Sequence, residues 1–203
     1  MTLTITASGN RGASGGWVRP MDEAHRILVP TVAHILYDRS GRLRSRVRIA
    51  GMSARVHALV RLPSLSNARA DAALVEPDRD WAAPRVASSR GHLNEFIAGL
   101  AVQCCLPDGG HLSGRMLSSD WAGRMRYSFG TRNVFRQWII AVDRKSSEPG
   151  TRPIRRGDSG LLWHTPDGVA VGLQIGVLAT CPDRTIITPF TTICDLFEVR
   201  TAA

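Results

Sequence analysis

Short apolar runs, some alternating with polar residues and some continuous, recur along this chain and are separated by Gly, Pro, Asp and Ser. Alternation of apolar and polar residues is the period of a strand with one buried face. Many short strands divided by turn residues are typical of a β-sandwich or β-barrel and not of a βαβ fold. The chain is therefore predicted to be all-β. The runs include "HRILVP", "ARVHALVRL", "DAALVEP", "FRQWIIAVD", "GLLWHT", "GVAVGLQIGVL" and "RTIITPF".

The 203 residues are enough to bury a substantial core, and all-β barrels of this length form one unit, so we expect a single unit with up to two lobes. The Gly- and Ser-rich residues 1–16 predict a flexible lead-in, which leaves 17–203 as the folded domain. "PDG" at 166–168 predicts a hairpin turn. Pro189, followed by apolar residues at helical spacing, predicts a closing C-terminal helix.

Location and cofactors are constrained mainly by what the sequence lacks. No uncharged apolar run approaches the length of a membrane span, and no signal peptide is recognisable, so a complete chain is expected in the cytoplasm and a fragment of a longer protein could be secreted. Four cysteines, Cys104, Cys105, Cys181 and Cys194, have no metal-ligand spacing and favour free, mostly buried thiols. No metal and no cofactor is expected.

The net charge of +9 raises nucleic acid as a partner, and all but one of the 26 basic residues are arginine. Arg42, Arg44, Arg46 and Arg48 alternate, which predicts one basic face on a strand. That face is either the solvated side of an edge strand or a phosphate-binding stripe. Few aromatic residues are interleaved for base stacking, so the sequence does not favour nucleic-acid binding.

The stretch "RRGDSG" contains Ser159 in a tetrad that is either a tight polar turn or a loop that presents a nucleophile. A nucleophilic serine needs a base, a group that orients the base, and donors for the developing oxyanion. Of the six histidines, only His34 stands where a strand-like run ends. The other five have structural explanations in strand-like runs, after glycines or before a turn: His25, His57, His92, His111 and His164.

Several carboxylates compete for the orienting role. Asp71 leads the apolar run "DAALV", so its carboxyl is expected to be partly buried beside a strand. The competitors are Asp38, Asp78 and Asp80.

Three blocks resemble those of trypsin-like (chymotrypsin-fold) serine peptidases: "LVPTVAHIL", "ADAALV" and "RRGDSG". The chain order His34, Asp71, Ser159 is the chymotrypsin-type order, and the short separations resemble a compact bacterial member. The resemblance implies two six-stranded antiparallel β-barrels with a short C-terminal helix, and a boundary between the barrels at roughly 80–95.

The resemblance also implies roles for individual residues. Ser159 would attack a peptide carbonyl, His34 would act as general base, and Asp71 would hold the imidazole. The N–H groups of Gly157 and Ser159 would form the oxyanion hole, and Gly157 would allow the turn that this requires.

The substrate-binding positions implied by the resemblance are Pro153, Gln174 and Gly176, and the substrate is a protein or peptide. Pro153 replaces the aspartate of trypsins, and Gln174 replaces a histidine of glutamyl endopeptidases, so neither specificity is expected. Asp158 is expected to turn inward, but no Ile-Val-Gly-Gly-like N-terminus is present to pair with it.

Three functional hypotheses remain. The first is a serine endopeptidase that acts through an acyl-enzyme. The second is a catalytically silent trypsin-fold binding or scaffold domain, against which the intact His-Asp-Ser set argues. The third is a basic nucleic-acid-binding β protein. The sequence predicts no membrane association and does not indicate the oligomeric state.

Overall fold

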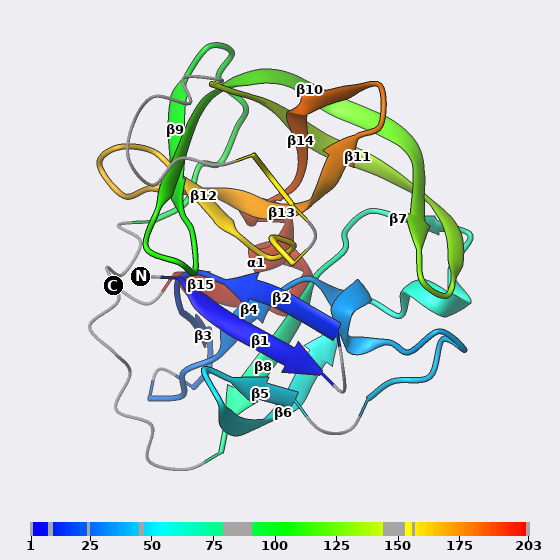
Figure 1. Ribbon diagram of the computed structural model, residues 1–203. Helices are drawn as coiled ribbons and strands as arrows, with labels where there is room; N and C mark the ends of the chain where they lie inside the picture. Colours follow the sequence, from blue (N-terminus) through cyan, green and yellow to red (C-terminus); the bar gives the residue numbers. More distant parts are fainter. Residues whose placement is uncertain are drawn as a thin grey trace.

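The computed structural model describes residues 2–7, 10–23, 25–44, 47–78, 91–143, 153–155 and 157–201. These residues form two antiparallel β-barrels, drawn one above the other in Figure 1, and a short C-terminal helix. The prediction of an all-β double barrel with a closing helix is confirmed. None of the helices formed by the described residues has the length and apolar character that crossing a membrane requires.

The first barrel is a six-stranded sheet whose two edge strands come together. Ser14 Oγ donates to the Pro30 carbonyl at 2.6 Å, and Thr31 Oγ1 donates to the Ala13 carbonyl at 3.0 Å, so side chains bridge the edges that no ladder closes. In sheet order, the strands are β2 (Asn10–Ser14), β1 (Leu3–Ala7), β5 (Val47–Ile49), β6 (Met52–Leu59), β8 (Ala73–Pro77) and β4 (Val29–Thr31).

The second barrel is closed by pairing between its first and last strands, β10 and β11. In sheet order, the strands are β10 (His111–Tyr127), β9 (Ala101–Cys105), β12 (Leu162–His164), β13 (Ala170–Leu178), β14 (Cys181–Pro189) and β11 (Gly130–Val142). Thr165 N donates to the Val169 carbonyl, which confirms the predicted turn at 166–168.

The remaining elements connect the barrels or close the chain. Helix α1 (Phe190–Phe197) follows β14 directly, as predicted, and buries Ile193. The other elements are short: β3 (Val18–Pro20), which pairs with β15 (Val199–Thr201), β7 (Asn67–Ala68), and the 3-10 helices η1 (Ala33–Leu36) and η2 (Leu62–Ser64).

The prediction of a flexible lead-in over residues 1–16 is wrong for the described part of that segment. Ile5 is fully buried on β1, which lies between β2 and β5 in the first barrel. The glycines allow close packing: a Cβ on Gly12 would lie 2.7 Å from Ile35 Cδ1, and one on Gly15 would lie 2.8 Å from Leu162 Cβ. At Gly12 and Gly15 glycine therefore reflects close packing, against η1 and against β12 of the second barrel.

Two further expectations concern the basic strand and the boundary between the barrels. The basic strand expected over residues 42–48 is reduced to β5, because the strand begins only at Val47. Arg42 and Arg44 lie outside it, and Arg46 is outside the described residues, so no strand carries the four-arginine stripe. Most of the expected boundary between the barrels also lies outside the described residues, between β8, which ends at Pro77, and β9, which begins at Ala101.

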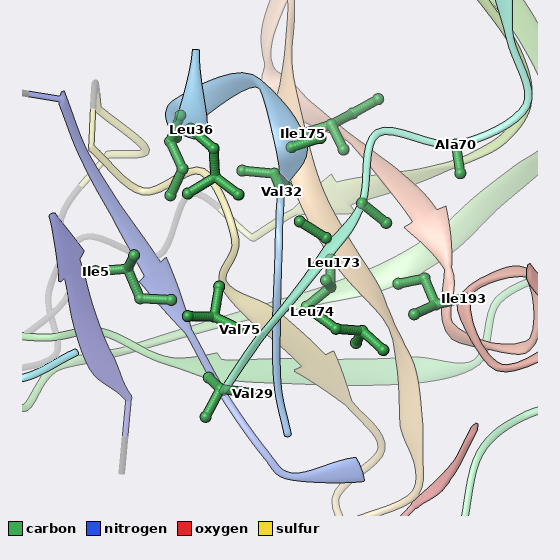
Figure 2. Close-up of a cluster of buried hydrophobic side chains, with 14 of the residues drawn as sticks. Ile5, Val29, Val32, Leu36, Ala70, Leu74, Val75, Leu173, Ile175 and Ile193 are labelled. Carbon is green, nitrogen blue, oxygen red and sulfur yellow. The ribbon is translucent and has the colours of Figure 1, made fainter. Parts of the chain in front are cut away.

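One hydrophobic cluster joins the two barrels, and the segment that carries His34 is anchored in it. Figure 2 shows Val32 and Leu36, which flank His34 in sequence, beside Ile175 of the second barrel and near Leu74 of β8. Val32 and Leu36 are fully buried. Burying an aliphatic side chain of this size contributes about 1.5–3 kcal/mol, so the backbone around His34 is firmly held.

The long β10–β11 hairpin, green in Figure 1, reaches from the second barrel to the first. Its strand β11 pairs with β7 in parallel through Asn133 and Val134. Arg132 donates from Nε to the Leu62 carbonyl at 2.8 Å and from a terminal nitrogen to the Pro63 carbonyl at 2.7 Å. These contacts fix the hairpin tip over the first barrel.

Glu76 on β8 ties this strand to the segment that leads into β4. It accepts from Arg26 at 2.8 Å through both oxygens and from Arg55 Nε at 2.8 Å. The hydrogen bonds from Arg26, with those from Arg55, lower the pKa of Glu76 from 4.5 to about 2, against the opposing effect of burial. The carboxylate therefore stabilises the fold above pH 4.5, and this contribution is lost as the pH falls through about 2.

The variant Glu76→Gln is expected to lower the free energy of unfolding at pH 7 by about 1–3 kcal/mol, allowing for solvent screening. The difference in unfolding free energy between the variant and the wild type should shrink as the pH falls towards 2, because the wild-type carboxyl is then protonated. Urea unfolding at several pH values measures both effects. Glu23→Gln is the control, because Glu23 contacts the same Arg26 from a half-exposed position. Equal losses of unfolding free energy in the two variants, independent of pH, would contradict the stabilising role of the Glu76 carboxylate.

Candidate active site

The pairing of β4 with β8 brings His34 and Asp71 together. In this antiparallel ladder Thr31 lies opposite Ala73, and continuing it by two residues places Ala33 opposite Asp71. The chain turns into η1 at this point, so His34 leaves the strand at its end, as the sequence predicted.

The Asp71 carboxylate contacts His34 at two places. Its Oδ2 lies 2.6 Å from His34 Nδ1, and its Oδ1 accepts from the His34 main-chain N–H at 3.0 Å. Asp71 is fully buried, whereas 18% of the His34 side chain is exposed. A neutral imidazole that donates from Nδ1 carries its lone pair on Nε2. The pair therefore presents a proton-accepting nitrogen.

The second barrel braces the Asp71 segment through a buried polar chain. Asp71 N donates to Thr188 Oγ1 at 3.3 Å, and that hydroxyl donates to Gln137 Oε1 at 2.8 Å. Gln137 Nε2 in turn donates to the Arg69 carbonyl at 2.8 Å. Thr188 and Gln137 are fully buried, so each hydrogen bond replaces water that these groups have lost. Neither role could be predicted from the sequence, because β11 and β14 carry no local signal that directs these residues to Asp71.

The loop that carries Ser159 is held against β2 and β13. Ala13 N donates to the Ser159 carbonyl at 2.7 Å, and Gly160 N donates to the Gln174 carbonyl at 2.8 Å. Asp158 is buried, as expected, and its Oδ2 accepts from the Arg155 main-chain N–H at 2.8 Å. This hydrogen bond gives the inward carboxylate a partner that the sequence did not identify.

Two main-chain N–H groups of this loop, those of Gly157 and Ser159, are not used in hydrogen bonds within the described part of the loop. Asp158 N and Gly160 N donate to main-chain carbonyls, but within the described residues Gly157 N and Ser159 N donate to none. Gly157 has a φ of +100°, which side chains other than glycine rarely adopt. The two N–H groups expected to form the oxyanion hole thus have no main-chain acceptor within the described residues.

His34, Gly157 and Ser159 line one groove of about 840 Å³ between the two barrels. The described residues contain no hydrogen bond between the His34 ring and the Ser159 hydroxyl. Such contacts are often long before substrate binds and tighten in the reactive complex.

The other wall of the groove comes from the tip of the β10–β11 hairpin, which the sequence did not reveal as part of a site. The Tyr127 ring lies over His34 with centroids 5.2 Å apart, and stacks on Phe129 at 5.3 Å. Burial, reinforced by the nearby Asp71 carboxylate, raises the pKa of Tyr127. Tyr127 therefore remains a neutral phenol that shields the His34–Asp71 pair from water.

The three predicted substrate-binding positions lie in different surroundings. Gly176 lines the groove, and a Cβ there would lie 2.6 Å from Met125 Cε. Gln174 is buried behind the groove, where it accepts from Trp163 Nε1 at 3.1 Å and donates to the Asp158 carbonyl at 3.4 Å. Pro153 is exposed and is not among the lining residues.

The remaining candidates lie away from His34 and Ser159. His57 contacts Arg26, His164 contacts the Thr165 carbonyl, and His92 lies 3.8 Å from Cys194 Sγ. Asp38 accepts from its own turn, and Asp80 is outside the described residues. The four cysteines form no disulfide with one another. Within the described residues, no group of three or more His, Cys, Asp or Glu side chains is placed to hold a metal ion.

No protein-family model and no curated protein matches the chain. Solved structures match it over nearly its full length. Protease A of Thermobifida fusca matches with a TM-score of 0.68 and 17% identity, covering 98% of this chain and 96% of that one. A Nocardiopsis protease matches with a TM-score of 0.69 and 17% identity, covering 99% and 97%.

A glutamic-acid-specific serine protease, which uses a histidine triad in substrate binding, matches with a TM-score of 0.69 and 15% identity, covering 98% of this chain and 97% of that one. At such identities the likeness is one of fold. This chain therefore has the chymotrypsin-like double-barrel fold of bacterial serine proteases.

Proposed function

We propose that the protein is a serine endopeptidase that cleaves peptide bonds through an acyl-enzyme. The observation that carries the proposal is the contact of the buried Asp71 carboxylate with the main-chain N–H and the Nδ1 atom of His34. His34 lines the same groove as Ser159. A buried carboxylate that orients an imidazole beside an accessible serine has the parts that acyl transfer needs.

The proposed reaction has two steps. Ser159 Oγ attacks the substrate carbonyl while His34 Nε2 takes its proton, and the oxyanion is bound by the N–H groups of Gly157 and Ser159. The imidazolium then protonates the leaving amine, which departs and leaves an ester on Ser159. In the second step water, deprotonated by His34, attacks the ester and releases the carboxylic acid, restoring the serine. Asp71 stabilises the imidazolium in both steps.

The groove also offers a surface for an extended peptide. Strand β13 pairs with β12 only as far as Leu173, and its residues 176–178 are paired on one side, by β14. Within the described residues the other edge is open. An open edge binds a peptide strand through main-chain hydrogen bonds, and Ile175 and Gly176 on this strand line the same groove as Ser159.

A fluorophosphonate probe tests the proposal without knowledge of the substrate, because it reacts with an activated serine. The purified protein is expected to be labelled at Ser159, and the variants Ser159→Ala and His34→Ala are expected to lose the label. Ser113→Ala is the control, because Ser113 is exposed on β10 outside the groove. Mass spectrometry of the labelled peptide locates the adduct. A folded protein that takes up no label would instead be a binding domain on the same fold.

A further inference from the structure

The charged residues in the described lining of the groove are all basic. Among the described lining residues they are Arg11, Arg124 and Arg126, and these include no Asp or Glu. The chain has 17 acidic residues, so their absence from this surface is a local property. The groove therefore carries a positive potential that attracts anionic ligands.

The arginines come from both barrels. Arg11 lies on β2, next to Gly12, whose Cβ position is 2.9 Å from the Ser159 carbonyl oxygen. Arg124 and Arg126 lie on β10 on either side of Met125, whose methyl group faces Gly176 of β13. A peptide that crosses the groove past Ser159 thus passes between arginine residues of both barrels.

These arginines are available to a ligand. Arg11, Arg124 and Arg126 are exposed, and none forms an ion pair within the part of the chain that the structure describes. Arg155, which is close to Ser159 in the sequence, is 3.2 Å from Asp108 and is not among the lining residues. Guanidinium groups bind carboxylates in a bidentate fashion.

The groove between these arginines is largely apolar. Its lining includes Trp121, Met125, Ile175, Val177, Leu178 and Ile186. Within the described lining no acidic group could pair with a basic side chain bound against this surface. An uncharged, apolar substrate side chain would bury area there without leaving an unpaired charge.

We infer that the groove selects acidic peptides, with an apolar residue against this surface and Asp or Glu residues on both sides of it. The inference rests on the proposed function and names its substrate class. A peptide is favoured over a nucleic acid because the open edge of β13 offers main-chain partners, whereas base stacking needs exposed aromatic faces. Tyr127 is buried against His34 and has no free face to offer.

Binding to the Ser159→Ala variant tests the inference independently of cleavage. The probes are short fluorescein-labelled peptides with a central leucine flanked by Glu, by Gln or by Lys, measured by fluorescence anisotropy. The Glu peptide is expected to bind about ten-fold more tightly than the Gln peptide at low salt, as two or three exposed ion pairs allow. The preference should weaken several-fold at high salt, because exposed charges are screened.

Variants that remove arginines show which of them cause the preference for the Glu peptide. In the Ser159→Ala background, R124Q/R126Q is expected to remove most of the preference for Glu over Gln. R48Q/R200Q lowers the net charge equally at exposed positions outside the groove and is expected to retain the preference. Equal binding of the Glu and Gln peptides would overturn the inference. Tighter binding of an oligonucleotide than of the Glu peptide would also overturn it.

The two proposals fail in different ways. If the wild-type protein takes up the fluorophosphonate label but cleaves the Gln peptide as fast as the Glu peptide, only the acidic preference is refuted. If the protein is never labelled but its Ser159→Ala variant still prefers the Glu peptide, the peptidase activity is refuted and the acidic groove stands.

Discussion

Replacing Asp71 with asparagine is expected to lower kcat by about 10⁴-fold while leaving the fold intact, as the corresponding change does in the trypsin-type triad. Asp71 Oδ1 accepts from the His34 main chain, and an asparagine oxygen can keep this hydrogen bond. Oδ2, 2.6 Å from His34 Nδ1, would become an NH2 group that donates. The imidazole would then carry its proton on Nε2, where it cannot accept one from Ser159.

The rate of fluorophosphonate labelling measures this effect, because it depends on the same proton transfer and needs no known substrate. The control is Asp78→Asn, since Asp78 is an exposed carboxylate just after β8 and was a competitor of Asp71 in the sequence. Asp78→Asn is expected to label at the wild-type rate. Labelling of Asp71→Asn at that rate would show that His34 does not depend on Asp71 for its tautomer.

The parts of the site that could be predicted from sequence are those whose position follows from their own strand. His34 stands at the end of β4 and Asp71 just before β8, so the pairing of these two strands brings them together. Ser159 lies in a loop whose glycines predict a turn, and Gly157 has the positive φ that such a turn requires.

The rest of the site depends on contacts that no local pattern records. Tyr127 reaches His34 only because the long β10–β11 hairpin bends across to β7, and its register shifts between Met116 and Gly123 set that bend. Gln137 and Thr188 are ordinary polar residues of strands until the fold places them behind Asp71. Such residues acquire their roles from tertiary packing.

The prediction of a flexible N-terminal segment is wrong for a related reason. Gly-rich sequence is usual in flexible termini, but it is equally required where two backbones approach closely. Gly12 lies against both Ile35 and the Ser159 carbonyl oxygen, so β2 forms part of the support of the serine loop. Composition alone does not distinguish these two uses of glycine.

Gly160→Ala should reveal how tightly β2 and the serine loop are packed, and it is expected to destabilise the protein by about 2–5 kcal/mol. Two costs add: Gly160 has a φ of +93°, and a new Cβ would overlap with the Ala13 carbonyl oxygen and come within 3.0 Å of Thr31 Oγ1. The obstructing atom belongs to backbone that also donates to the Ser159 carbonyl at 2.7 Å, so it cannot move without moving the serine.

Gly168→Ala is the matched control, because Gly168 has a φ of +91° but nothing lies within 4 Å of its Cβ position. It carries the cost of the positive φ alone, about 1–2 kcal/mol. Urea unfolding compares the two variants, and a similar m value in each would assign the difference to the folded state. Equal losses would mean that the serine loop is not pressed against β2. A larger loss in Gly160→Ala, together with slower labelling of the molecules that remain folded, would mean that the first barrel positions the nucleophile of the second.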